Sequence, residues 1–242
     1  MKNFSALARR ELGVYFVSPM AYIIITAMLL LSGWDFWSGM AGAVENRLPV
    51  DFSGTLAMTV YIVVLSSALV TMRLIAEEKS KGTLEIILTA PISDAAFVLA
   101  KFAAAMVLLA FLLVLTVGYL IIISRYGPVD VGAAACGYLG VLMVGAVTYS
   151  IGLFISSLCS SQVTAGVITL ALSLLLVLCD MLASYLPEGT FWHDFLSAID
   201  LTRNFGDFIR GIVDRGRFVY LSSVVAFFLF LTTRVVESRR WR

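Results

Sequence analysis

The chain has 242 residues, of which 60% are hydrophobic and only 14% are charged, and its formal net charge is +1. The mean hydropathy of the whole chain is +0.97, and the sequence contains repeated long apolar runs. Together these features exclude an ordinary soluble domain and predict an all-α, polytopic membrane protein. The near-neutral charge gives no sign of nucleic-acid binding, and the three cysteines and single histidine lack the spacing of a metal site. We therefore predict neither a catalytic residue nor a metal ligand in the chain.

The first predicted element is an amphipathic helix over residues 2–17. Basic residues accompany a set of apolar residues that lie close together on one helical face: Phe4, Ala8, Leu12 and Tyr15. This pattern is typical of a helix that lies in the membrane interface. We therefore expect an N-terminal interfacial helix on the cytoplasmic surface.

The first span is expected over about residues 20–38, directly after Pro19. A cleaved signal peptide is the alternative, because the Ala41-Gly42-Ala43 segment resembles a cleavage site. The apolar region is longer than that of a signal peptide, and it ends at Trp34 and Trp37, which suit an aromatic belt at a membrane surface. These features favour a retained span.

Five further apolar runs complete a prediction of six transmembrane helices in a single transmembrane domain, residues 1–242. They cover about residues 55–75, 95–124, 132–156, 163–186 and 218–236. The third of the six spans is longer than a bilayer requires, so its start should protrude and place Lys101 at the level of the headgroups. Glycines punctuate the fourth span, and small residues let helices approach closely, so we expect this span at the centre of the bundle.

A polar break extends over residues 77–94, between the second and third spans. Gly82 should end the preceding helix, and Thr83 should cap a short amphipathic helix that stops at Pro91. Glu85 in the first turn suits the helix dipole. The apolar face of this helix consists of Leu84, Ile87 and Leu88. The pattern favours a helix that contacts a partner at the membrane surface, and an ordinary solvated loop is the alternative.

The segment EEKSKGTLEIILTAPISDAAFVLAKF, residues 77–102, resembles the cytoplasmic hairpin of type-2 ATP-binding-cassette (ABC) permeases. In that family a Gly-Thr-Leu-Glu start opens a coupling helix, a proline closes it, and a lysine follows at the foot of the third span. The matching residues are Gly82, Thr83, Leu84, Glu85, Pro91 and Lys101. The opening RRELGVYFVSPMAYII and the closing LTTRVVESRRW are similar to the gliding-motility-associated branch of the family.

This resemblance implies the membrane subunit of an ABC exporter in the cell inner (cytoplasmic) membrane. Two such chains, expected to form a homodimer, would enclose the substrate pathway. Two copies of a separate ATPase subunit would hold ATP and Mg, because this chain has no GxxxxGK[ST] phosphate loop and no cofactor of its own. An auxiliary membrane protein is a further candidate partner. The residues expected to contact the ATPase are Glu77, Glu78, Gly82, Thr83, Leu84, Glu85, Ile87 and Leu88.

Residues 187–217 form a mostly polar segment that we place outside the membrane. Five apolar residues in it define one face of an amphipathic helix: Leu201, Phe205, Phe208, Ile209 and Ile212. Asp200 is placed to cap this helix, and its charged residues fall on the opposite face at pairing distances. The resemblance implies a re-entrant or interfacial helix beside the substrate exit, and a helix that simply floats at the interface is the alternative.

The basic residues set the expected topology. With both termini and residues 77–94 in the cytoplasm, the inner segments hold 11 of the 17 Lys and Arg residues, as the positive-inside rule requires. Two acids, Asp35 and Asp180, lie within or near spans, towards the outer end. They are either functional intramembrane polar residues or partly hydrated positions near the outer headgroups.

Two other classes of protein fit the same sequence. A stand-alone secondary carrier or channel would work without an ATPase, although such a carrier usually has more charge at the midplane or broken helices. A membrane scaffold would anchor an assembly and transport nothing. Co-purification of a nucleotide-binding partner, and ATPase activity that is sensitive to residues 77–94, would separate the three classes.

Overall fold

A computed structural model of the chain describes residues 2–46, 52–83, 93–126, 130–187 and 189–240. The regular elements in these ranges are all helices. They are α1 (Lys2–Val17), α2 (Pro19–Glu45), α3 (Ser53–Thr71), α4 (Ala76–Ser80), α6 (Asp94–Ile123), α7 (Val131–Leu158), α8 (Gln162–Ala183), α9 (Phe191–Ile199), α10 (Leu201–Ile209) and α11 (Arg215–Arg240). Within the described ranges, six helical segments are long and apolar enough to cross a membrane: α2, α3 with α4, α6, α7, α8 and α11. The described part of the chain is therefore all-α and has the helices of a multi-pass membrane protein.

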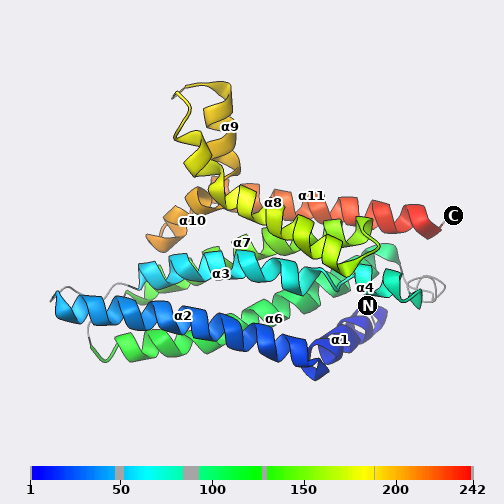
Figure 1. The fold of residues 1–242 in the computed structure, drawn as a ribbon, viewed down its shortest axis with the longest axis horizontal. Helices are drawn as coiled ribbons and strands as arrows, with labels where there is room; N and C mark the ends of the chain where they lie inside the picture. Colours follow the sequence, from blue (N-terminus) through cyan, green and yellow to red (C-terminus); the bar gives the residue numbers. More distant parts are fainter. Residues whose placement is uncertain (1, 47–51, 84–92, 127–129, 188, 241–242) are drawn as a thin grey trace.

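The long helices lie side by side in an elongated bundle (Figure 1). Helices α1 and α4 and the C-terminal end of α11 lie together at one end of the bundle, which we call the α4 end. There α1 packs against α6. The C-terminal ends of α2 and α6 and the N-terminal ends of α3 and α7 lie at the opposite end, and α9 projects away from the long helices (Figure 1).

Helix α7 is the centre of the bundle, since it contacts α3, α6, α8, α10 and α11. Its glycines make this possible. A Cβ added at Gly140 would lie 2.6 Å from the Cβ of Phe208 on α10, and one added at Gly152 would overlap the side chain of Thr71 on α3. The absence of a side chain at both positions therefore lets two neighbouring helices approach the backbone of α7 directly.

Two helix boundaries differ from the sequence predictions. Helix α2 continues well past residue 38 to Glu45, through Gly39 and Gly42, because no proline interrupts it. It ends at Asn46, whose side-chain amide donates to the Gly42 carbonyl at 2.8 Å. The second span ends at Thr71 rather than near residue 75, and a turn separates it from the short helix α4. This turn, residues 72–75, contains no glycine or proline that would predict a break, and tertiary contacts stabilise it.

Candidate functional site

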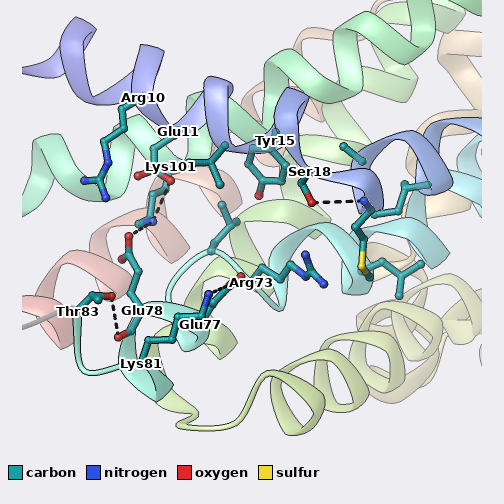
Figure 2. A pocket seen from close by; sticks show the side chains of 16 residues that line it. Arg10, Glu11, Tyr15, Ser18, Arg73, Glu77, Glu78, Lys81, Thr83 and Lys101 are labelled. Atoms are coloured by element: carbon teal, nitrogen blue, oxygen red, sulfur yellow. Dashed lines mark hydrogen bonds and ion pairs between the residues drawn. The ribbon is translucent and has the colours of Figure 1, made fainter.

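Lys101 lies near the start of α6, at the α4 end of the bundle. Ser93 caps this helix by accepting a hydrogen bond from the Ala96 amide. The Lys101 Nζ is 3.1 Å from Glu11 Oε2 on α1 and 2.9 Å from Glu78 Oε1 on α4 (Figure 2). Only 2% of the Lys101 side chain is exposed. Protein therefore encloses this ammonium group, which the sequence had placed among the headgroups.

We call Lys101, Glu11 and Glu78 the Lys101 cluster. Both carboxylates are largely withdrawn from solvent, with side-chain exposures of 9% for Glu11 and 14% for Glu78. The Phe97 ring, with its centroid 5.1 Å from Nζ, adds a cation–π contact. Charges in such a poorly hydrated place interact strongly, and each becomes costly once its partner is removed. The cluster therefore joins α1, α4 and α6, which are distant in sequence, through one ammonium group.

Helix α4 is also attached to the C-terminal end of α7. The Ser156 hydroxyl accepts hydrogen bonds from the backbone amides of Ile75 at 3.2 Å and Ala76 at 3.0 Å. The Lys79 ammonium donates to the carbonyls of Leu158 at 3.1 Å and Cys159 at 3.0 Å. Carbonyls at a helix C-terminus have no partner within the helix and favour a positive charge. These contacts provide hydrogen-bond partners for backbone groups at the start of α4 and at the end of α7. They also hold the turn between α3 and α4 in place.

The structure describes four of the eight residues predicted to contact an ATPase. Glu78 belongs to the Lys101 cluster, and Glu77 pairs with Lys81 at 2.6 Å. Gly82 has φ +69°, a left-handed conformation that suits glycine after a helix end, as predicted. The Thr83 hydroxyl donates to the Glu78 carbonyl at 3.3 Å. The other four lie outside the described residues, as does the short helix that they would form: Leu84, Glu85, Ile87 and Leu88.

A cavity of about 270 Å³ lies beside the Lys101 cluster, between α1, α2, α3 and α4 (Figure 2). Polar and charged side chains line one part of it, and apolar residues line the rest. The Tyr15 hydroxyl, on its wall, donates to the Val70 carbonyl at 3.2 Å. Burial raises the pKa of Tyr15 well above its usual range, so this phenol remains a neutral donor. The Nε of Arg73, another lining residue, is buried and has no hydrogen-bond partner in the described parts of the chain.

The predicted outer amphipathic helix corresponds to α10. Its Leu201, Phe205 and Phe208 are buried, and both phenylalanines pack on Gly140 of α7. Ile209 is partly buried. Asp200 caps the helix, as predicted, by accepting a hydrogen bond from the Arg203 amide. Helix α10 is therefore part of the bundle and does not float free of it.

The C-terminal part of this segment differs from the prediction. The helix ends at Ile209, so Ile212 lies beyond it and is 55% exposed. Asp207 and Asp214 both pair with Arg217, at 3.0 Å and 3.8 Å, a partner that the sequence prediction did not include. The positive φ of Gly211, +78°, turns the chain between α10 and α11 and brings Arg217 back onto α10.

The two acids predicted within or near the spans lie on different helices. Asp35 lies on α2 and is half-buried. Asp180 lies on α8, and the structure does not describe its side chain. Among the described residues no group of three or more histidine, cysteine and acidic side chains could hold a metal ion.

Sequence reasoning missed most of the partners at the α4 end. Glu11 stands alone as an acid in a basic helix, and this isolated opposite charge was the available signal for a buried ion pair. Ser156 and Lys79 carry no such signal, because their role depends on where α7 ends relative to α4. Arg73 was counted only as an inner positive charge.

A comparison with family models matches residues 2–236 to the ABC-2 family transporter proteins. A comparison with curated proteins finds no significant match. The family match extends over α1, all six candidate spans and the Lys101 cluster. It agrees with the resemblance to type-2 ABC permeases that residues 77–102 carry. It does not identify the gliding-motility-associated branch. The chain therefore belongs to the ABC-2 family of transporter proteins and is a multi-pass membrane protein of that family.

Proposed function

We propose that this chain is the transmembrane subunit of an ABC exporter in the inner membrane, with the α4 end and both termini in the cytoplasm. Two copies form the substrate pathway, and a separate ATPase that binds ATP and Mg drives them. Members of the ABC-2 family typically work with an ABC ATPase, which supports the partner class. The basic residues that gather at the α4 end support its cytoplasmic placement.

The observation that carries the proposal is the attachment of α4 to three other helices. Lys101 ties α4 to α1 and α6, while Lys79 and Ser156 tie it to α7. A force applied to residues 77–91 would reach these helices through directional contacts rather than through a flexible loop. Helix α7 also contacts α3, α8, α10 and α11, so movement of α4 would reach most of the bundle.

In this mechanism the predicted coupling helix docks on the ATPase through Leu84, Ile87 and Leu88. Closure of the two ATPases on ATP moves the hairpin, and α4 transmits the movement to the helices that line the pathway. Glu78 serves inside the permease, so its part in coupling is indirect: it holds the hairpin base to Lys101. This assignment refines the expectation that Glu78 contacts the ATPase itself.

The test is co-expression with a candidate ABC ATPase, purification through a tag on this chain, and measurement of ATP hydrolysis in lipid nanodiscs. We expect the ATPase to co-purify with the wild-type chain, and we expect Leu88→Asp either to release it or to uncouple its ATP hydrolysis from transport. Flux through the purified chain in vesicles without an ATPase would instead indicate a carrier or channel. Stable assembly with neither flux nor ATP dependence would indicate a scaffold.

A further inference from the structure

The cavity beside the Lys101 cluster is amphipathic. Four basic and three acidic side chains line it: Arg10, Arg73, Lys81, Lys101, Glu11, Glu77 and Glu78. Its remaining wall is largely apolar and comes from Val14, Met20, Ala21, Ile24, Leu69 and Leu74. A ligand that fits both parts must itself carry a polar group and a hydrocarbon part.

The charges in the cavity do not cancel. Lys101 is matched by Glu11 and Glu78, and Lys81 is matched by Glu77. Arg10 and Arg73 have no ion pair within the described ranges, so the cavity keeps an excess of positive charge. The missing partner is therefore an anion.

Arg73 is the side chain that most needs this anion. It lies in the turn between α3 and α4, and its Nε is buried without a hydrogen-bond acceptor among the described residues. A buried donor without an acceptor costs free energy, and a guanidinium suits a phosphate particularly well because its donors form a planar fork. Figure 2 shows the Arg73 guanidinium on the Ser18 side of the cavity, away from Lys101, Glu11 and Glu78.

The apolar wall opens towards the outer surface of the bundle. Val14 lines the cavity and is 60% exposed, and Leu69 lines it and is 44% exposed. The volume of about 270 Å³ is slightly smaller than that of sites for drug-sized ligands, which are roughly 300–1,000 Å³. The cavity could hold the headgroup of a lipid and the first part of its acyl chains. The remaining part of the acyl chains would extend past Val14 and Leu69 into the bilayer.

The geometry points to a binding site for a membrane phospholipid with an anionic headgroup, its phosphate on Arg73 and its acyl chains over Val14 and Leu69. Basic pockets beside transmembrane helices near the membrane surface bind acidic lipids by this combination of charge and apolar area. Arg10, at the polar rim, adds long-range attraction. The bound lipid would fill the space between α1 and the hairpin base, so it would stabilise the Lys101 cluster next to it. This inference concerns the isolated chain and does not depend on an ATPase partner.

The experiment is native mass spectrometry of the purified full-length chain, titrated with phosphatidylglycerol, with phosphatidylcholine of the same acyl chains, and with inorganic phosphate. We expect one site that prefers phosphatidylglycerol. Arg73→Gln should weaken it by about tenfold or more, which corresponds to at least about 1.4 kcal/mol and suits the loss of charged hydrogen bonds. Arg125→Gln is the matched control, since Arg125 is exposed in the turn after α6.

Three results would overturn the proposal. Equal binding of phosphatidylcholine would show that the charge plays no part, and equal binding of inorganic phosphate would show a site for a soluble anion. Unchanged phosphatidylglycerol binding in Arg73→Gln would remove Arg73 from the site. If that variant does not fold, Arg73→Lys decides: it keeps the charge but loses the fork, so wild-type affinity in it would contradict the phosphate contact.

Discussion

Replacing Lys101 with methionine should strongly destabilise the α4 end of the bundle. Methionine keeps the length and apolar character of the lysine stem, so the change removes the ammonium and little packing. It leaves Glu11 and Glu78 facing each other with little solvent. Removing one partner of a buried ion pair costs about 3–5 kcal/mol. Because 1 kcal/mol shifts the melting temperature of a domain of 150–250 residues by about 2–4 °C, we expect a decrease of at least about 6 °C.

The assay is thermal unfolding of the purified chain in detergent, followed by tryptophan fluorescence and by loss of the monodisperse size-exclusion peak. Lys81→Met is the matched control. Its side chain is 63% exposed, and its pair with Glu77 is an i,i+4 contact on a helix surface. Pairs of this kind contribute about 0.3–0.5 kcal/mol, so the control should lose no more than about 2 °C.

A rescue variant separates the charge from the packing. In the triple variant Lys101→Met, Glu11→Gln, Glu78→Gln, no uncompensated charge remains, so most of the lost stability should return. Equal melting temperatures for Lys101→Met and Lys81→Met would refute the claim that buried ion pairs hold the hairpin base. Failure of the rescue would mean that Lys101 acts mainly through its contact with Phe97.

Three further predictions concern other parts of the chain. Leu88→Asp should release the ATPase in a pull-down or uncouple ATP hydrolysis from transport, because a docked leucine contributes roughly 1.5–3 kcal/mol to binding. Glu85→Gln should cost only about 0.3–1 kcal/mol, because Glu85 interacts only with the helix dipole. Wild-type assembly in Leu88→Asp would contradict the docking role. Phe205→Asp should lower the free energy of unfolding by about 3 kcal/mol or more, because Phe205 is only 1% exposed and packs on Gly140. Ile212 is exposed, so Ile212→Asp should change the free energy of unfolding by no more than about 0.5 kcal/mol in the same assay. The topology can be tested with an impermeant maleimide in a background without native cysteines. Ser80→Cys should react only after the membrane is opened, whereas Tyr185→Cys should react in intact cells. The reverse pattern would invert the proposed topology.

The sequence was sufficient for features that depend on neighbouring residues. Long apolar runs identify the six candidate spans, and Asp200 caps α10 as predicted because a cap acts within one helical turn. The glycines of α7 predicted a central helix because their spacing is visible along one helix. Helix boundaries were less accurate. The first span was expected to end near residue 38, but the helix continues to Glu45.

Features that depend on tertiary structure could not be predicted. Glu11 and Lys101 are 90 residues apart in sequence, and only the packing of α1 on α6 brings them together. The break between α3 and α4, Met72 to Ile75, contains neither glycine nor proline, and it depends on Ser156, which is 81 residues from Ile75. Arg217 pairs with Asp207 across the Gly211 turn, although the helical pattern favoured pairs within α10.

The choice of polar contacts at the α4 end has a mechanical consequence. Apolar helix packing is non-directional and allows helices to slide, whereas the Lys101 and Lys79 contacts each require one arrangement of donor and acceptor. Helix α4 has only one and a half turns, so its own hydrogen bonds could not keep it in place. Its position must therefore come from its contacts with the rest of the bundle, among them the polar contacts with α1, α6 and α7. A displacement of the hairpin then has two outcomes: the three helices move with α4, or the buried charge pairs break at a cost of several kcal/mol. Concerted movement is the less costly outcome, which is the behaviour that coupling to an ATPase requires.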